Sequence, residues 1–379
     1  MCGIAGFVND MPIDVKCPVL QRMTDMIAHR GPDSEGHYID EHAALGHRRL
    51  SIIDLGGGQQ PIYNEDGSKV ITFNGEIYNY QTLREELIAA GHTFTTKSDT
   101  EVLLHGYEQW GVDLLQRVRG MFTFVIWDKN KQELFGARDH FGIKPFYYAK
   151  MNGTFMYASE IKSLLRHPDF VKELNAEALK PYMTFQYPAI GETFFKGVYK
   201  LPEGHYFTYR DGKMDIHRYY DEDFREGKQK LGELVNSIDQ TVCDSVKAHQ
   251  IADVEVGSFL SSGVDSSYVA AVARPQHTYS IGFGKGTYNE SQQAGELAEL
   301  LKLNNTAESL TDEEAFAAFP RIQWHLDEPD SNPSCVPLYF LSALAAKDVK
   351  VVLSGEAPTS CSPDTSTTAC TPNSSPSRW

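Results

Sequence analysis

The spacing of hydrophobic residues changes near residue 230, and this change divides the chain into two regions that fold by different rules. Before it, the pattern is that of short strands with a few helices. Residues 120–128 alternate with both faces apolar, which predicts a strand covered on both sides. Further strands are predicted at 134–137, 145–149 and 154–158, and helices at about 15–28, at 80–90 and from Ser98, which has capping-box spacing to Glu101. We therefore expect an α+β domain over residues 1–210.

The second region, residues 228–356, alternates between strand and helix signals. Strands are predicted at 254–260, 278–283 and 349–353, with helices at 234–249, 266–273, 289–301, 311–324 and 335–347. This order predicts an α/β domain with a parallel sheet and helices on its faces. The polar stretch 221–230 is the expected linker between the two domains.

Bulk properties exclude several classes of protein. The 35 basic and 51 acidic residues give a formal net charge of -16, which disfavours nucleic acid and anionic membranes as partners. No apolar run approaches the ~20 residues of a membrane span, and the start has no basic region typical of a signal peptide. Six scattered cysteines without a CxxC pair argue against a zinc site and a disulfide framework, and favour a cytoplasmic location.

The first residues can carry chemistry at the chain end. If Met1 is removed, Cys2 holds a thiol and a free α-amine, and the amine can act as the general base for its own thiol. Such a residue can hydrolyse an amide through a thioester. The alternative is an ordinary buried cysteine near the terminus.

Four further motifs change the balance between these alternatives: RGPD at 30–33, HRRLSIID at 47–54, FNGEIYN at 73–79 and SDTE at 98–101. Glutamine as substrate would need a guanidinium for its α-carboxylate, acidic groups for its α-ammonium and an oxyanion hole. Each part also has a simpler explanation. Arg49 could form a surface ion pair, Asn74-Gly75 a hairpin turn, and Asp99 a favourable first-turn acid of a helix.

Taken together in this order behind MCGI, the motifs resemble a class II glutamine amidotransferase domain, a four-layer αββα fold with an N-terminal nucleophile. The longer span 1–356 resembles the glutamine-hydrolysing asparagine synthetases of the bacterial type. The resemblance implies that Cys2 is the nucleophile and that Asn74 and Gly75 form the oxyanion hole. It also implies that glutamine is bound by Arg49, Leu50, Ser51, Ile52, Ile53, Asn74, Gly75, Glu76 and Asp99.

Residues 256–267 (VGSFLSSGVDSS) predict a strand, a loop of small residues and the start of a helix, an arrangement that can bind phosphate through exposed N–H groups. A plain strand–helix turn is the alternative. The run resembles the pyrophosphate loop of ATP pyrophosphatases, usually SGGxDS, with Ser262 in place of a glycine. The resemblance implies contacts to ATP from Leu260, Ser261, Gly263, Asp265, Ser266, Ser267, Ile281, Ser354 and Gly355. It also implies a magnesium ligand at Asp265 and a catalytic acid of the synthetase at Glu356.

The last 23 residues, 357–379, differ from the rest: fifteen are Ser, Thr or Pro, which predicts disorder. The family continues after Glu356 with a Gly-Ala-Asp-Glu-Leu-Phe-x-Gly-Tyr run. A back-translation of residues 357–368 with one guanine restored before it reads Gly-Ala-Asp-Glu-Leu-Phe-Ala-Gly-Tyr-Ile-Tyr-Tyr. We therefore expect an out-of-frame tail, caused by a one-base deletion in the gene or in its sequencing. A natural disordered tail is the alternative.

These features predict a cytoplasmic, glutamine-dependent asparagine synthetase with glutamine, aspartate and ATP as substrates and Mg²⁺ as cofactor. Because the synthetase region would be incomplete, we expect this chain to keep only the glutaminase activity. The alternatives are another class II amidotransferase or a non-catalytic remnant that binds glutamine. A sugar-phosphate amidotransferase is disfavoured because it needs no ATP loop. The oligomeric state stays open, a homodimer included.

Overall fold

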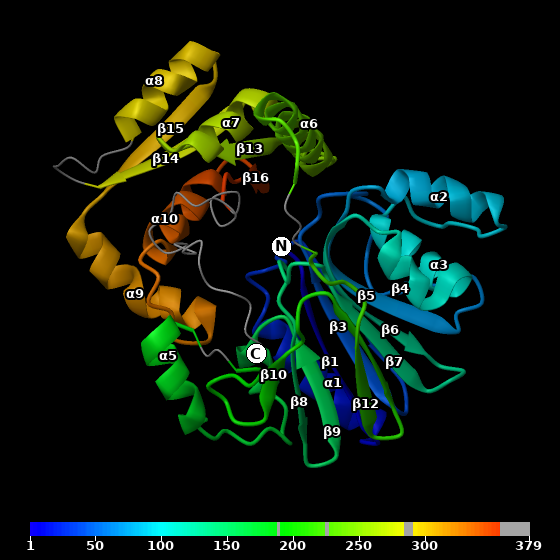
Figure 1. Ribbon diagram of the computed structural model, residues 1–379. Coiled ribbons are helices and arrows are strands. Elements are labelled where there is room, and N and C mark those ends of the chain that lie inside the picture. Colours follow the sequence, from blue (N-terminus) through cyan, green and yellow to red (C-terminus); the bar gives the residue numbers. More distant parts are fainter. Residues whose placement is uncertain (188–189, 224–226, 284–290, 357–379) are drawn as a thin grey trace. The chain divides into compact units, whose positions relative to one another are not determined.

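The computed structural model describes residues 1–187, 190–223, 227–283 and 291–356 (Figure 1). The chain forms two compact units. The first comprises Met1–Lys228 together with Gln323–Asn332, and the second comprises Gln229–Ile322 and the chain from Pro333 onward. The predicted tail, 357–379, lies outside the described residues.

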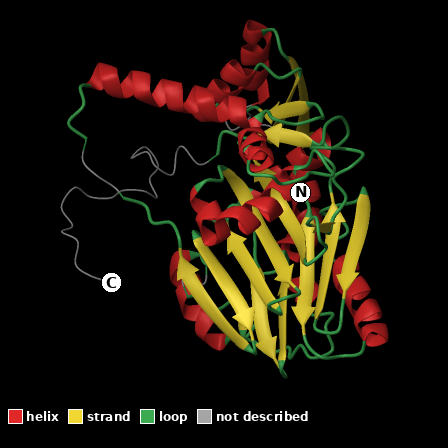
Figure 2. Ribbon diagram, turned by 90° about the vertical axis from the view of Figure 1, so that its right-hand side faces the viewer, coloured by secondary structure: helices red, strands yellow, loops and turns green. Residues whose placement is uncertain are grey.

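The first unit contains two six-stranded antiparallel sheets. One sheet has the order β10 (Val198–Lys200), β8 (Tyr147–Met151), β9 (Thr154–Ala158), β1 (Gly3–Val8), β3 (Ala43–Arg49) and β2 (Ser34–Ile39). The other has the order β12 (Lys213–Arg218), β11 (His205–Arg210), β7 (Glu133–Arg138), β6 (Gly120–Asp128), β5 (Lys69–Ile77) and β4 (Ile62–Tyr63). In Figure 2 the strands of this unit run between helices.

Three buried clusters hold these layers together. The sheets pack on each other through residues such as Ile4, Trp127 and Phe207. Helices α1 (Ile13–Asp25) and α4 (Ile161–Leu164) cover the outer face of the β1 sheet, and α2 (Tyr80–Ala89) and α3 (Asp99–Trp110) cover the β5 sheet. The predicted four-layer αββα fold is confirmed. Strand β6 is buried on both faces, as its apolar alternation predicts.

Of the two hydrogen bonds that the predicted capping box at α3 requires, the one accepted by the side chain of Glu101 is absent, so that part of the prediction is wrong. Ser98 is the N-cap, and its hydroxyl accepts from Thr100 N at 3.2 Å. Glu101 does not reach back to the Ser98 N–H. Its carboxylate instead accepts from Thr95 N at 2.7 Å and Thr96 N at 2.6 Å, because the preceding loop folds under the helix. Glu101 therefore ties the loop to α3.

The second unit is an α/β domain, as predicted. Its parallel sheet has the order β15 (Asn304–Leu310), β14 (His277–Phe283), β13 (Val256–Phe259) and β16 (Val351–Leu353). The helices are α6 (Leu231–His249), α7 (Val264–Ala273), α8 (Ser291–Leu301), α10 (Cys335–Ala345) and most of α9 (Asp312–Leu326), whose residues from Gln323 onward belong to the first unit. Strand β15 is not predicted from the sequence, because this edge strand is mostly polar and exposed and lacks a hydrophobic alternation.

The segment Gln323–Asn332 is anchored to the first unit by buried acids. Asp327 pairs with Lys162 at 2.8 Å and accepts from Ile161 N at 2.6 Å, and Glu328 pairs with Lys200 at 2.6 Å. The first unit also contains the short helix α5 (Leu179–Phe185) and the 3₁₀ helices η1 (Gly111–Gln116) and η2 (Ala176–Ala178).

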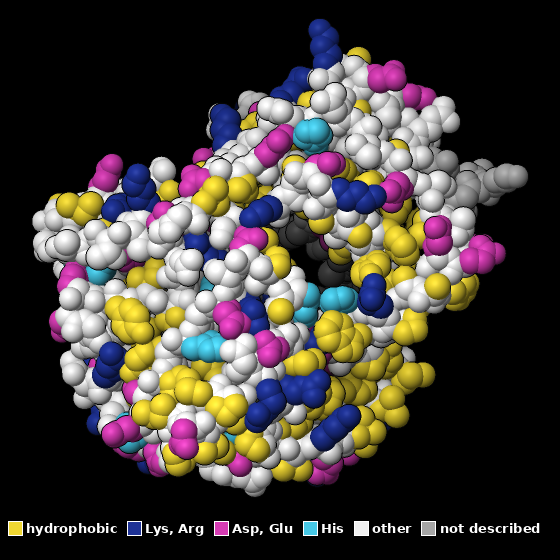
Figure 3. Space-filling view, turned by 180° about the vertical axis from the view of Figure 1, so that it is seen from behind, with side chains coloured by type: hydrophobic (Ala, Val, Ile, Leu, Met, Phe, Trp, Pro, Cys, Tyr) yellow, Lys and Arg dark blue, Asp and Glu magenta, His cyan; other side chains and the backbone are white. Residues whose placement is uncertain are grey.

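On the face shown in Figure 3, acidic and basic side chains are interspersed, and neither sign of charge dominates. Among the described helices, none has the length and apolarity that crossing a membrane requires. The four cysteines within the described ranges, Cys2, Cys17, Cys243 and Cys335, are all free thiols.

Candidate active site

One edge of strand β5 presents backbone donors away from its neighbour β6. The backbone N–H and C=O of Phe122 in β6 both bond to Asp139, on the side away from β5. Gly75 lies opposite Phe122, so the two residues form a pair without hydrogen bonds between them, and the N–H of Gly75 points away from β6. Phe73 and Ile77 have the same parity, and their N–H groups donate to Gln60 Oε1 at 2.6 Å and Asp99 Oδ2 at 3.0 Å on that side. The Gly75 N–H lies between them on the same edge. Both Asn74 and Gly75 are inside the strand, so the alternative of a hairpin turn is wrong.

Glycine is required at position 75 by the approach of β6. A Cβ atom there would lie 2.2 Å from Met121 O and 2.7 Å from Phe122 Cα. Both contacts are with backbone, so the strands would have to separate to accept a side chain. The absence of a side chain keeps the Gly75 N–H in its place.

The side chains of Asn74 and Glu76 point from β5 toward the other sheet, as Val70 does. Asn74 is 1 % exposed, and neither atom of its amide has a hydrogen-bond partner among the described residues. Burial, and then the charge of Asp99, raise the pKa of Glu76 to about 8. A buried amide without a partner is rare in folded proteins and is expected where a ligand completes its hydrogen bonds.

Cys2 precedes β1, and its thiol lies against β3. The Sγ atom is 3.6 Å from Leu50 O and 3.5 Å from Leu50 N. Burial raises the pKa of the thiol, a backbone hydrogen bond to Leu50 lowers it, and the charges of Asp99 and Arg49 act on it as well. Strand β1 contacts β5 across the two sheets, and His47 of β3 bonds Phe73 O of β5 at 3.0 Å. These contacts bring Cys2 and the β5 residues into one region.

Arg49 and Asp99 complete this region from β3 and α3. Arg49 is 4 % exposed and forms no salt bridge among the described residues; its Nη2 donates to Ile53 O at 3.0 Å and Asp54 O at 2.7 Å. The alternative of a surface ion pair is therefore wrong. A Cβ on Gly58 would lie 2.6 Å from Arg49 Nη2 and 3.2 Å from Ser98 Cβ, so Arg49 is close to the start of α3. Burial raises the pKa of Asp99 to about 6.

The predicted segment Leu50–Ile53 folds beside Cys2 and Arg49. Leu50 contacts the thiol, the carbonyl of Ile53 accepts from Arg49, and Ser51 N donates to Asp33 Oδ2 at 2.8 Å. Ile52 has no such contact among the described residues. Asp33 belongs to the RGPD turn, whose role is thus to hold this segment in place.

Two cations that contact the first two residues of the chain were not singled out in the sequence. Arg30 donates from Nε to Cys2 O at 2.9 Å and pairs through Nη1 with Glu160 at 3.0 Å. Lys144 is 4 % exposed, and burial, followed by the charge of Arg30, lowers its pKa to about 8. Its Nζ lies 2.9 Å from Met1 Sδ. The run GIKPFYY that contains Lys144 carried no signal beyond strand character.

Met1 is present in the structure, so the nitrogen of Cys2 is part of a peptide bond. The free α-amine at the chain end is that of Met1, and its burial lowers its pKa to about 5. Removal of Met1 would expose the Cys2 amine in the same surroundings.

In the second unit the predicted nucleotide loop follows β13 and leads into α7. Ser261 and Ser266 hydroxyls lie 2.8 Å apart, Gly263 N donates to Ser261 Oγ at 3.1 Å, and Ser267 Oγ donates to Gly263 O at 2.6 Å. Ser262 is exposed and is absent from the residues with positive φ, so its side chain is compatible with the loop backbone. The serine side chains thus form hydrogen bonds within the loop itself.

The order of the sheet places this loop at a topological switch point. The chain leaves β13 toward β14 on one side, and β16 lies on the other side of β13. Gly355, just after β16, meets the loop: a Cβ there would lie 2.3 Å from Ser266 N. Leu260 donates to Tyr279 O at 2.9 Å beside Ile281, and Glu356 N donates to Ser354 Oγ at 3.2 Å. In open parallel sheets, ligands bind at the carboxyl ends of strands at such a point.

A cavity of about 580 Å³ lies elsewhere in the first unit. Its lining residues include Gln59, Tyr63, Glu65, Thr95 and Glu101, and none of the predicted glutamine-binding residues. We therefore do not assign it to glutamine.

Comparison with known proteins agrees with this division. Residues 1–220 match the family described as glutamine amidotransferase domain, and residues 237–358 match asparagine synthase. The chain is 43 % identical to the glutamine-hydrolysing asparagine synthetase 1 of Bacillus subtilis, over 94 % of this chain and 57 % of that protein. It is 36 % identical to asparagine synthetase 2 of the same organism, over 94 % of this chain and 51 % of that protein.

A solved structure, the glutamine phosphoribosylpyrophosphate amidotransferase from B. subtilis in complex with ADP and GMP, has a TM-score of 0.44 and 15 % identity. The match covers 81 % of this chain and 65 % of that one. The chain spans between half and three fifths of the length of the two B. subtilis synthetases. The thiol of Cys2 lies against Leu50, a serine loop lies at the switch point of a parallel sheet, and both regions match known families. The chain belongs to the family of glutamine-hydrolysing asparagine synthetases.

Proposed function

We propose that the protein is a glutamine-dependent asparagine synthetase in which Cys2 releases ammonia from glutamine. The observation that carries the proposal is the buried amide of Asn74, which has no partner among the described residues and lies next to the outward-facing N–H of Gly75. A side-chain amide and a backbone N–H on adjacent residues of one strand, in the region of the Cys2 thiol, suit the oxyanion of a tetrahedral intermediate.

In the proposed reaction the Cys2 sulfur attacks the carboxamide carbon of glutamine, and the Cys2 amine takes the thiol proton. The C–N bond then breaks, ammonia leaves with that proton, and water hydrolyses the thioester to give glutamate. Arg49 would bind the α-carboxylate through the guanidinium donors that Ile53 and Asp54 do not use. Glu76 and Asp99 would bind the α-ammonium, whose charge would favour ionisation of both acids.

We propose that the second unit uses ATP to activate aspartate. Formation of β-aspartyl-AMP releases pyrophosphate, and ammonia then displaces AMP to give asparagine. The loop at 260–267 would hold the phosphates, with Ser354 and Gly355 on the adjacent strand end and Glu356 as a catalytic acid. Backbone near Ile281 would contact adenine.

Magnesium would be held by Asp265 in the first turn of α7. Mg²⁺ is usually bound by one or two carboxylates together with substrate phosphates, and Asp265 lies next to the phosphate loop and to Gly355, so the residues present suit it. The ion would neutralise charge on the phosphate groups. A cytoplasmic location is part of the proposal because the scattered cysteines suit a reducing compartment. The oligomeric state stays open, a homodimer included.

Two assays on the purified full chain test the proposal: glutamate released from glutamine, and pyrophosphate released with ATP, aspartate and either ammonia or glutamine. We expect both, with Cys2→Ala removing only the glutamine-dependent reactions. Glutamate release without any pyrophosphate would support the narrower expectation of glutaminase activity alone, which neither the comparisons nor the described residues favour. No glutamate release by a chain freed of Met1 would refute the assignment of Cys2.

A further inference from the structure

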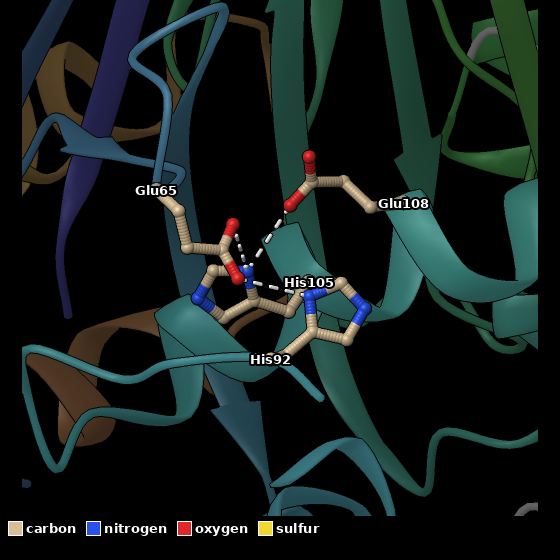
Figure 4. A group of neighbouring side chains, drawn as sticks. All are labelled: Glu65, His92, His105 and Glu108. Atoms are coloured by element: carbon tan, nitrogen blue, oxygen red, sulfur yellow. Dashed lines mark hydrogen bonds and ion pairs between the residues drawn. The ribbon is translucent and has the colours of Figure 1, made fainter. Parts of the chain in front are cut away.

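Four side chains with metal-binding atoms meet in the first unit, away from Cys2 (Figure 4). They are Glu65 after β4, His92 after α2, and His105 and Glu108 on the same face of α3. One ligand atom from each lies within 4.8 Å of the other three. His105 is fully buried, while Glu65 stands at the surface.

The distances within this cluster suit one small cation. His105 Nδ1 is 3.1 Å from Glu108 Oε2 and 3.3 Å from Glu65 Oε2, and His92 Nδ1 is 3.0 Å from Glu65 Oε1. Tetrahedral ligands with bonds of about 2.0–2.1 Å lie roughly 3.3 Å from one another. The side chains would move little to surround an ion.

A second layer of groups orients each histidine. His105 Nε2 lies 3.5 Å from Glu101, whose carboxylate is itself fixed by Thr95 and Thr96. His92 Nε2 lies 3.3 Å from Gln109 Oε1. The Gln109 acceptor favours the tautomer of His92 with a proton on Nε2, and the negative charge of Glu101 favours the same tautomer of His105. Nδ1 of each ring is then left to face the cluster. Metal-binding histidines are held in this way by carboxylate or carbonyl groups.

The two carboxylates are oriented as well. Glu108 Oε1 accepts from Asn64 Nδ2 at 2.6 Å, so that Oε2 faces the cluster, and Glu65 Oε1 accepts from Thr93 N at 3.2 Å. The simpler interpretation is a network of ion pairs with protonated histidines. That interpretation explains the contacts within the cluster. It does not require Glu101 and Gln109 to lie near the Nε2 atoms of His105 and His92.

We propose that Glu65, His92, His105 and Glu108 bind one first-row divalent cation of the zinc type in a structural site. Two imidazoles disfavour Mg²⁺ and Ca²⁺, which prefer oxygen ligands, and two carboxylates would balance the charge of the ion. Four protein ligands without an open position are typical of structural zinc. The absence of a CxxC pair bears only on cysteine ligands and does not exclude this set.

The proposed ion would join three segments that are separate in the sequence: the turn after β4, the loop after α2, and α3. The cavity of about 580 Å³, which Glu65 and Glu101 line, gives solvent access from one side. Helix α3 begins at Asp99, so the ion would fix the helix from which that acid projects.

The test uses the full chain without a polyhistidine tag, stripped with a chelator and titrated with zinc in a calorimeter. We expect one ion per chain, with affinity reduced at least about tenfold in His92→Ala and in Glu65→Gln. Both residues are near the surface, so these variants should fold. Matched controls are His42→Ala and Glu85→Gln, which change the same residue types outside the cluster and should bind zinc as the parent does.

A second readout is stability. At free zinc about 100-fold above Kd, the folding equilibrium should shift about 100-fold toward the folded state, and at the same zinc concentration this shift should fall to about tenfold or less in His92→Ala. Absence of zinc binding by the folded chain would overturn the proposal. So would binding that survives both substitutions, or binding that is lost only when thiols are alkylated.

Discussion

Asn74→Ala should lower activity without lowering stability, because the amide it removes has no hydrogen-bond partner among the described residues. Asn74 is 1 % exposed, and both its Nδ2 and Oδ1 are buried without a hydrogen bond among the described residues. Most buried amides stabilise the protein through their hydrogen bonds. This one is expected to be held unpaired for a substrate.

The magnitude follows from two opposing effects on the free energy of unfolding. Removing a buried, unpaired polar group relieves a desolvation cost of about 1–3 kcal/mol. The space left behind costs about 1 kcal/mol. The variant should therefore be about as stable as the parent or more stable by about 2 kcal/mol. Loss of one oxyanion donor should at the same time lower kcat for glutamine hydrolysis by about 10²–10³.

Asn175→Ala is the matched control. Asn175 is also buried, at 5 % exposure, but its Nδ2 donates to Thr193 O at 2.9 Å and its Oδ1 accepts from Glu177 N at 3.2 Å. Its loss should destabilise the protein by about 1–3 kcal/mol and leave kcat unchanged. At about 2–4 °C per kcal/mol for a domain of this size, the two variants should differ in Tm by at least about 2 °C.

The assays are thermal unfolding followed by circular dichroism and glutamate release at saturating glutamine. The reasoning is refuted if Asn74→Ala is destabilised as strongly as Asn175→Ala, since its amide would then have protein partners. It is also refuted if kcat of Asn74→Ala falls less than about tenfold, because an oxyanion donor is worth more than that.

Cys2→Ala should abolish glutamate release while the circular dichroism spectrum stays native, and Cys2→Ser should be severely impaired because a hydroxyl ionises far less; residual activity in the alanine variant would exclude the nucleophile. Burial and Asp99 raise the pKa of Glu76 from 4.5 to about 8, so the folded state holds the proton longer and stability falls as pH rises between about 4.5 and about 8. Glu76→Gln should therefore raise Tm at pH 8.5 but not at pH 4, and a Tm gain equal at both values would contradict this. Gly355→Ala, whose Cβ would lie 2.3 Å from Ser266 N, should reduce pyrophosphate release and leave glutamate release intact; normal pyrophosphate release would argue that Gly355 does not fix the loop.

Local sequence patterns were sufficient for the elements whose hydrophobic period is strong. Residues 120–128 are apolar on both faces, and they form a strand buried between other layers. The helix at 80–90 was predictable from the spacing of Leu83 and Leu87, both of which are buried. Strand β15 was not predictable, because it is held by pairing with β14 rather than by apolar residues of its own.

The same distinction between local sequence and tertiary structure applies to the candidate site. The sequence by itself indicated which residues carry the chemistry, since the thiol of Cys2, the amide of Asn74 and the guanidinium of Arg49 are properties of the residues in recognisable motifs. Their environment was decided only by the tertiary structure. Pairing of β1 with β3 and packing of the two sheets bury Asn74 without a hydrogen-bond partner among the described residues, and Lys144 reaches Met1, next to Cys2, across 143 sequence positions. The same holds for Glu101, whose spacing predicts a capping box but whose carboxylate binds the loop before the helix. A local motif determines which groups are present, whereas burial and long-range pairing determine their partners and their pKa, because both depend on atoms that the motif does not contain.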